Sequence, residues 1–180
     1  MANLNFKIIA SVIFLIAFSM DLKAQKSSYF TAIHNANIQI KCSLNNTPLA
    51  WATDTIDILV NKQTGEFTAK LLVDNLHFAA SNADFKGGNG ENSGKYLEMT
   101  GIIPVDEVMA NSNNAIDRKV EITSTFNDRE YISTFLFTIL KMPSGFSVMA
   151  NGTISHSALE IQNLEDLADD LVIIISFTGY

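Results

Sequence analysis

The segments EYISTFLFTIL (residues 130–140), KMPSG (141–145) and FSVMANGTI (146–154) follow one another in this chain. The two outer segments are rich in the aromatic and β-branched residues that favour strands. The connection between them holds Pro143 and Gly145. Proline presets φ for a turn and glycine tolerates a positive φ. The sequence therefore predicts an antiparallel hairpin at the centre of the fold.

The first strand of this hairpin has two different faces. One face carries Tyr131, Phe135, Phe137 and Ile139, and the other carries Ile132, Thr134, Leu136, Thr138 and Leu140. A strand that is apolar on one face and mixed on the other fits the wall of a barrel with a packed or ligand-filled interior. The alternation alone leaves open which face points inward. This stretch contains no catalytic signature.

Further strands are expected at short intervals on both sides of the hairpin, because apolar and polar residues alternate between turn signals. Residues 81–94 read as a long loop, and a short helix capped by Asn163 is expected over 164–169. A further helical turn is expected after Asp106. The pattern predicts an all-β barrel or sandwich, with strands over 29–33, 36–44, 55–60, 66–73, 96–105, 119–126 and 171–177.

The N-terminus has the features of an export signal. Lys7 precedes a thirteen-residue apolar run over 8–20, and Ala24 is a small residue suited to a cleavage site. The run is short for a membrane-spanning helix, although an uncleaved N-terminal anchor is the alternative. Cleavage after Ala24 would leave a single domain of 156 of the 180 residues, long enough to bury a core. We therefore expect a signal peptide over 1–24, one domain over 25–180, and a periplasmic or secreted protein.

Charge and cysteine content exclude several classes of protein. The whole chain has a net charge of −7, and loss of Lys7, Asp21 and Lys23 makes the remainder −8. Such an acidic domain without a basic cluster is not drawn to nucleic acid or anionic lipid. Cys42 is the sole cysteine, so no internal disulfide is possible and packing must supply the stability. Cys42 alternates with apolar residues, which favours a buried position over a reactive thiol.

The order of these features resembles the YceI-like proteins, which are exported lipocalin-like antiparallel barrels of bacteria. The resemblance spans residues 33–178. The matching segments are 56–73 with QTGEF at its turn (63–67), SGKYLEMTGII (93–103), TFNDRE (125–130), 146–161 and 169–177. Two segments depart from the family pattern: Asn127-Asp128 replaces a glycine-containing turn, and the glycine- and asparagine-rich residues 86–94 replace a phenylalanine-rich segment, of which Phe85 is the remnant.

The resemblance implies an antiparallel lipocalin-like barrel of about eight strands, with one short helix near the C-terminus. It also implies a binding function, since known members hold long apolar isoprenoid-type molecules inside the barrel. An eight-stranded barrel is just wide enough to be filled by side chains or to hold one small ligand. The aromatic residues then form either a ligand lining or an ordinary core. The expected lining residues are Phe67, Leu71, Phe78, Phe85, Phe126, Phe135, Phe137 and Val148.

Other polar groups have weaker claims to a chemical role. The histidines His34, His77 and His156 lack metal-ligand spacing. Oxygen-bearing side chains in the 82–91 loop suit calcium, but their spacing is not that of an EF-hand, so a solvated loop is the better interpretation. The acidic residues Glu165, Asp166, Asp169 and Asp170 suit acid–base chemistry or, more simply, a capped and solvated helix end. We expect no metal site and no catalytic site.

Three classes of function remain. The first is an exported protein that binds an apolar, isoprenoid- or lipid-like molecule, as a monomer or homodimer, without nucleic acid and without a transmembrane segment after signal cleavage. The second is a non-catalytic structural or interaction module of the cell envelope with a filled core. The third is an enzyme whose catalytic groups come together only on folding. No cofactor is expected beyond a bound isoprenoid or lipid.

Overall fold

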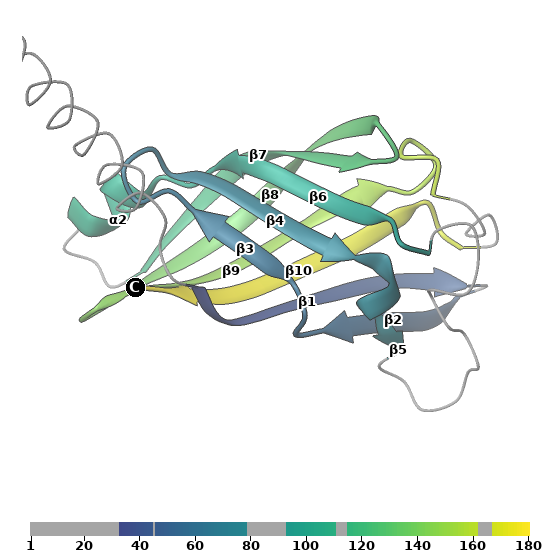
Figure 1. The fold of residues 1–180 in the computed structure, drawn as a ribbon, viewed down its shortest axis with the longest axis horizontal. Coiled ribbons are helices and arrows are strands. Elements are labelled where there is room, and N and C mark those ends of the chain that lie inside the picture. Colours follow the sequence, from purple (N-terminus) through teal and green to yellow (C-terminus); the bar gives the residue numbers. More distant parts are fainter. Residues whose placement is uncertain (1–32, 45, 79–92, 111–114, 162–166) are drawn as a thin grey trace, which may run out of the picture. The chain divides into compact units, whose positions relative to one another are not determined.

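The computed structural model describes residues 33–44, 46–78, 93–110, 115–161 and 167–180, which form one antiparallel sheet (Figure 1). The sheet order is β3-β4-β6-β7-β8-β9-β10-β1-β2-β5, so the predicted all-β antiparallel class is confirmed, with ten described strands in place of about eight. The strands are β1 (Ile33–Leu44), β2 (Thr47–Thr53), β3 (Asp57–Val60), β4 (Glu66–Leu72), β5 (His77–Phe78), β6 (Tyr96–Ile102), β7 (Ala115–Phe126), β8 (Arg129–Met142), β9 (Gly145–Ser155) and β10 (Asp170–Gly179).

The turn between β7 and β8 accounts for one departure from the family pattern. Asn127 and Asp128 have φ values of 49° and 62°, and both are left-handed. Two successive positive φ values define the hairpin turn whose twist matches that of the flanking strands, and asparagine and aspartate tolerate them better than most residues. Asn127 and Asp128 therefore form this turn without a glycine.

The β8–β9 hairpin is confirmed, but its connection is shorter than expected. Met142 pairs with Gly145, so only Pro143 and Ser144 remain outside the ladder. Gly145 is not among the residues with positive φ, which corrects the reason for a glycine here. A Cβ atom at Gly145 would overlap the backbone carbonyl of Gly179, so the close approach of β9 and β10 requires a glycine at this position. At Gly65, by contrast, φ is +73°, a value that glycine adopts without strain.

Strand β2 was missed by the sequence analysis, which expected no strand between 36–44 and 55–60. Pro48 lies inside β2 opposite Ser43, and a proline within a run argues against a strand. The sheet tolerates this proline because, within the described residues, β5 pairs with Trp51 and Ala52 alone, and the outer edge of β2 at Pro48 forms no ladder there.

The described helical segments are short. The α-helix α2 (Val105–Ala110) matches the helical turn expected after Asp106, and a single 3-10 turn, η1, covers Val73–Asn75. Arg118 on β7 bonds Glu107 of α2, with 2.7 Å between Nε and Oε2. The helix expected over 164–169 lies largely outside the described residues, as do the signal peptide and the first residues of the strand expected over 29–33.

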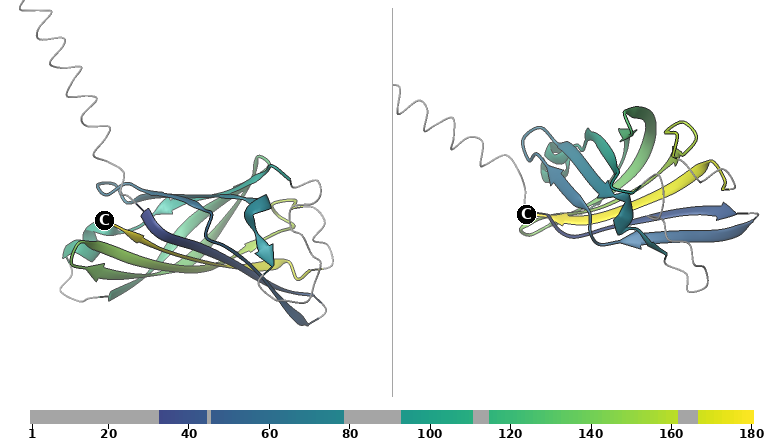
Figure 2. Two further views of the ribbon diagram at one scale, coloured as in Figure 1. Left: turned by 60° about the horizontal axis from the view of Figure 1, so that its bottom comes forward. Right: turned by 45° about the vertical axis from the view of Figure 1, so that its right-hand side comes forward.

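The sheet curls so that its inner face encloses the core (Figure 2). Buried residues alternate with half-buried or exposed ones along the strands, as in β10, where Leu171, Ile173, Ile175 and Phe177 are buried between half-buried neighbours. The strand β3 stands at one end of the sheet order, yet it lies near β1, the third strand from the other end. Since β3 is paired with β4 alone, the wall of the barrel is not hydrogen-bonded between β3 and β1 in the described residues.

Candidate ligand-binding site

The inner face of the sheet is largely apolar. On β8 the inward residues are Phe135, Phe137 and Ile139, whereas Leu136 and Leu140 point outward and are each 46% exposed. Of the expected lining residues, six are buried on this wall: Phe67, Leu71, Phe126, Phe135, Phe137 and Val148. Phe85 and the side chain of Phe78 lie outside the described part of the chain. That these side chains contact a ligand stays a prediction.

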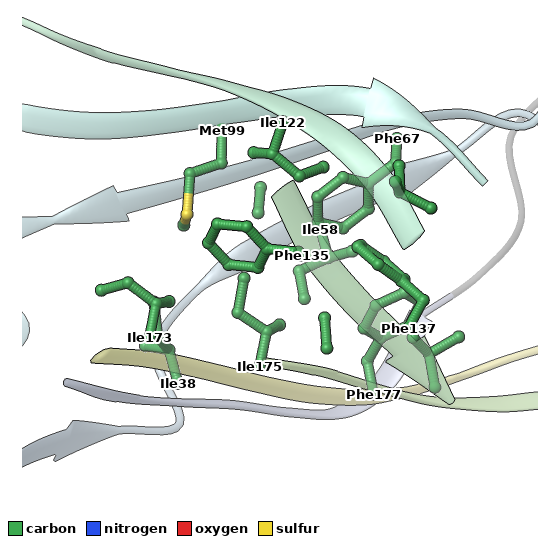
Figure 3. Close-up of a cluster of buried hydrophobic side chains, with 14 of the residues drawn as sticks. Ile38, Ile58, Phe67, Met99, Ile122, Phe135, Phe137, Ile173, Ile175 and Phe177 are labelled. Carbon is green, nitrogen blue, oxygen red and sulfur yellow. The ribbon is translucent and has the colours of Figure 1, made fainter. Parts of the chain in front are cut away.

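Four phenylalanines fill the interior at the end that carries the β3–β4 and β8–β9 turns. The ring of Phe67 stacks on Phe177 at 5.9 Å between centroids and meets Phe137 edge-on at 5.8 Å (Figure 3). Phe146 meets Phe177 edge-on at 6.4 Å. Offset-stacked and edge-to-face pairs at these distances are favourable aromatic contacts. This end of the barrel is therefore packed by its own side chains.

A glycine shapes the middle of the wall. Phe135 on β8 packs directly over Gly152 on β9, where an added Cβ atom would overlap the phenyl ring. The strand can pass this close to the ring because glycine has no side chain. The position of the Phe135 ring thus depends on the neighbouring strand as well as on its own.

A group of hydroxyls interrupts the apolar wall near the β7–β8 turn. Ser124 and Tyr131 are direct cross-strand partners, and Ser133 is opposite Ile122, one step further along the same face. The Oγ atoms of Ser124 and Ser133 are buried without a hydrogen-bond partner among the described residues. The sequence analysis placed this part of the chain in the strand expected over 119–126 and did not single out Ser124. The available signal was a serine at a position whose neighbours on the same face are apolar.

A groove runs along the unpaired seam between β1 and β3. It has a volume of about 520 Å³. Its apolar lining comes from both strands, while Asp57 and Lys70, which are cross-strand partners on β3 and β4, supply charges. The lining residues are Ile33, Ala36, Ile56, Asp57, Ile58, Leu59, Thr68 and Lys70. None of them was among the expected lining residues, because the seam exists only once the sheet has curled.

The connection from β9 to β10 is held by a carboxylate. Asp169 accepts hydrogen bonds from Ser155 Oγ at 2.8 Å and from the backbone N–H of Ser157 at 2.9 Å. The hydrogen bonds from Ser157 and then Ser155 lower the pKa of Asp169 from 3.8 to about 2. A carboxyl that stays ionised above this pKa is a structural acceptor rather than a general acid at neutral pH. His156 is buried beside it, with Nε2 3.8 Å from Asp169 Oδ1.

The described residues include no group of three or more His, Cys, Asp or Glu side chains placed to hold a metal ion. The side chains of His34 and His77 and the 82–91 loop, on which a histidine metal site or a calcium site would depend, lie outside the described part of the chain. Cys42 is half-buried, and burial raises the pKa of its thiol, as expected for a packed rather than a reactive cysteine. No helix within the described ranges is long and apolar enough to span a membrane.

Comparison with known proteins finds similarity in structure but not in sequence. No protein-family model matches the chain, and no curated protein matches it. A polyisoprenoid-binding domain from Saccharophagus degradans, implicated in plant cell wall breakdown, superimposes with a TM-score of 0.67 and 9% identity, covering 84% of this chain and 97% of that one. BcnA from Burkholderia cenocepacia gives a TM-score of 0.55 at 11% identity, covering 81% and 96%.

These similarities define the class of fold. The chain has the lipocalin-like barrel fold of the YceI-like proteins, although it shares only 9% and 11% identity with the two structures compared. The resemblance predicted from strand order and turns is therefore confirmed at the level of the fold. At identities this low the likeness describes architecture, and function has to be argued from the site.

Proposed function

We propose that this protein is an exported, non-catalytic binding protein that holds an apolar, isoprenoid- or lipid-like molecule in its β-barrel. The observation that carries the proposal is an apolar inner wall together with a seam between β1 and β3 that no ladder closes in the described residues. The groove of about 520 Å³ at this seam is lined mainly by apolar side chains. The fold-level likeness to a polyisoprenoid-binding domain supports the same ligand class by analogy.

Affinity in such a site comes from removing apolar ligand surface from water. Each Å² of buried apolar surface contributes roughly 25 cal/mol, before the entropic costs of binding are subtracted. The seam offers an entry path, because separating β3 from β1 breaks no ladder hydrogen bonds among the described residues. Asp57 and Lys70 lie at the groove and keep it partly polar.

We further propose that the protein acts outside the cytoplasm, in the periplasm or beyond. Support comes from the apolar run over 8–20 and the small residue at Ala24. Expression with the complete N-terminus, followed by mass determination of the exported protein, should give a chain that begins at Gln25. An exported chain that retains residue 1 would instead indicate an uncleaved anchor.

A second candidate is an interaction module with a filled core. Two observations favour it: the phenylalanine packing around Phe67, and the apolar side chains on the outer face of adjacent strands. Leu136 and Leu140 on β8 are exposed there, and Met149 on β9 is 57% exposed beside them. An exposed apolar patch of this kind is typical of a surface that meets another protein.

Native mass spectrometry of the protein from its own cell envelope, followed by organic extraction, separates the two candidates. A stoichiometric apolar adduct would establish the binding protein and identify its ligand. A clean apo mass that stays unchanged after incubation with polyprenol would favour the interaction module, and cross-linking in the envelope should then recover a partner.

A further inference from the structure

The hydroxyl oxygens of Ser124 and Ser133 are buried, and the described residues around them offer no hydrogen bond. Ser124 is fully buried on the inner face between Ile122 and Phe126, and its cross-strand neighbours are Met99 on β6 and Tyr131 on β8. Backbone groups around Ser124 are engaged in ladders on both sides, because β7 pairs with β6 and with β8 at this position. Neither Oγ atom has a partner among the described residues.

Size alone does not account for serine at both positions. A buried hydroxyl without a partner carries a desolvation cost, and buried polar groups in native proteins are nearly always hydrogen-bonded. Alanine would occupy the same small space without that cost. Inward positions on the neighbouring strands are apolar, including Leu97 and Met99 on β6. Two unpartnered hydroxyls on adjacent strands therefore mark a local exception in the wall.

We propose that Ser124 and Ser133 form a polar subsite inside the barrel that hydrogen-bonds an uncharged oxygen, hydroxyl or carbonyl, of an otherwise apolar ligand. This inference rests on the proposed function and adds the chemistry of the ligand's polar group. A hydroxyl both donates and accepts a hydrogen bond, so a serine pair suits either oxygen. The two serines lie diagonally across β7 and β8 on one face, where side chains are about 7–8 Å apart or closer, so an oxygen that enters between them can bond either hydroxyl.

The charges near this end of the barrel argue against an ionised group at the serines. Lys95 sits 5.9 Å from the centroid of the Phe126 ring, and Arg129 is exposed and paired with Glu160 at 2.8 Å. Arg129 is therefore already paired, and Lys95 lies over an aromatic ring. Burying a phosphate next to two neutral hydroxyls would carry a large desolvation cost. The subsite is therefore selective for an uncharged oxygen.

The test compares three ligands of the same C15 skeleton on purified protein stripped of lipid: farnesol, the hydrocarbon farnesene and farnesyl phosphate. Wild-type protein should bind farnesol about tenfold tighter than farnesene, the ratio expected for one well-placed hydrogen bond. The double variant Ser124→Ala/Ser133→Ala should bind both within about twofold. Its unfolding temperature should equal or exceed that of wild type, since the lost hydroxyls had no partner. Thr134→Ala, which removes an outward hydroxyl from β8, should keep the tenfold preference.

The outcomes distinguish this inference from the function on which it rests. A double variant that keeps the tenfold preference overturns the serine subsite while leaving a ligand-binding barrel. Farnesyl phosphate binding more than tenfold tighter than farnesol, with the gain lost in Lys95→Gln, overturns the uncharged group in favour of an anion at the rim. Wild-type protein that binds none of the three ligands overturns the proposed function itself.

Discussion

Replacing Phe67 by alanine should destabilise the fold by about 3–5 kcal/mol. Phe67 is 1% exposed and its ring contacts those of Phe137 and Phe177. Loss of the buried ring forfeits roughly 2–3 kcal/mol of apolar transfer free energy, and each lost aromatic pair adds about 0.5–1.5 kcal/mol. For a domain of this size, such a loss lowers the melting temperature by roughly 10–15 °C.

The chain carries its own probe for this measurement. Trp51 is the sole tryptophan and is 5% exposed, so its fluorescence should shift to longer wavelength on unfolding in urea. Phe67→Ala should lower the urea midpoint without changing the slope of the free energy with urea. The matched control is Leu136→Ala, at a position that is 46% exposed, and it should stay within about 0.5 kcal/mol of wild type.

A double-mutant cycle isolates the aromatic contact from simple burial. Phe67→Ala and Phe177→Ala should couple by about 0.5–1.5 kcal/mol, because the rings are in direct contact. A cost below about 1 kcal/mol for Phe67→Ala, or no coupling with Phe177, would refute the conclusion that this end of the barrel is packed by its own phenylalanines.

Three other expectations concern separate parts of the molecule. The carboxyl of Asp169 should titrate near pH 2 by NMR, and Ser155→Ala should raise that pKa; because the folded pKa lies below the ordinary 3.8, the carboxylate's contribution to stability is complete above pH 4 and lost as the pH falls toward 2. Gly152→Val should lower the free energy of unfolding by about 1–3 kcal/mol in urea titrations, because its side chain displaces the ring of Phe135; an unchanged midpoint would contradict the close packing. Cys42 should react with iodoacetamide at pH 7 more slowly in the folded protein than in urea, and equal rates would contradict its burial.

Strands and turns could be predicted here because their signals are local. The alternation along β8 reports a period of two, and Gly65 provides the positive φ that its turn requires. The Asn127-Asp128 turn follows the same logic, although its left-handed geometry could be read only from the backbone. Strand β2 was missed because Pro48 argues against a strand. The proline is compatible with the strand because of how β2 pairs with its neighbours, and that pairing is visible only in the tertiary structure.

The candidate site was predictable only in its residue types. An apolar lining with Phe67 and Phe137 was expected, and both side chains are buried on the inner wall. The groove at Ile58 was not expected, because it arises where β3 comes near β1 without pairing. The sequence could not predict that the Ser124 hydroxyl lacks a hydrogen-bond partner among the described residues, since this depends on the side chains that β6, β7 and β8 place around it.

The sequence by itself determined that this chain forms antiparallel strands joined by tight turns around an apolar core, since those properties follow from side-chain alternation and from φ preferences at single residues. Only the tertiary structure decided which face of β8 is inside, because the two faces differ in burial only after the sheet curls. Curling also decided that Phe67, Phe137 and Phe177 meet, although they are far apart in the chain. The physical reason is that each strand specifies its own periodicity, whereas the interior is a property of strands packed together.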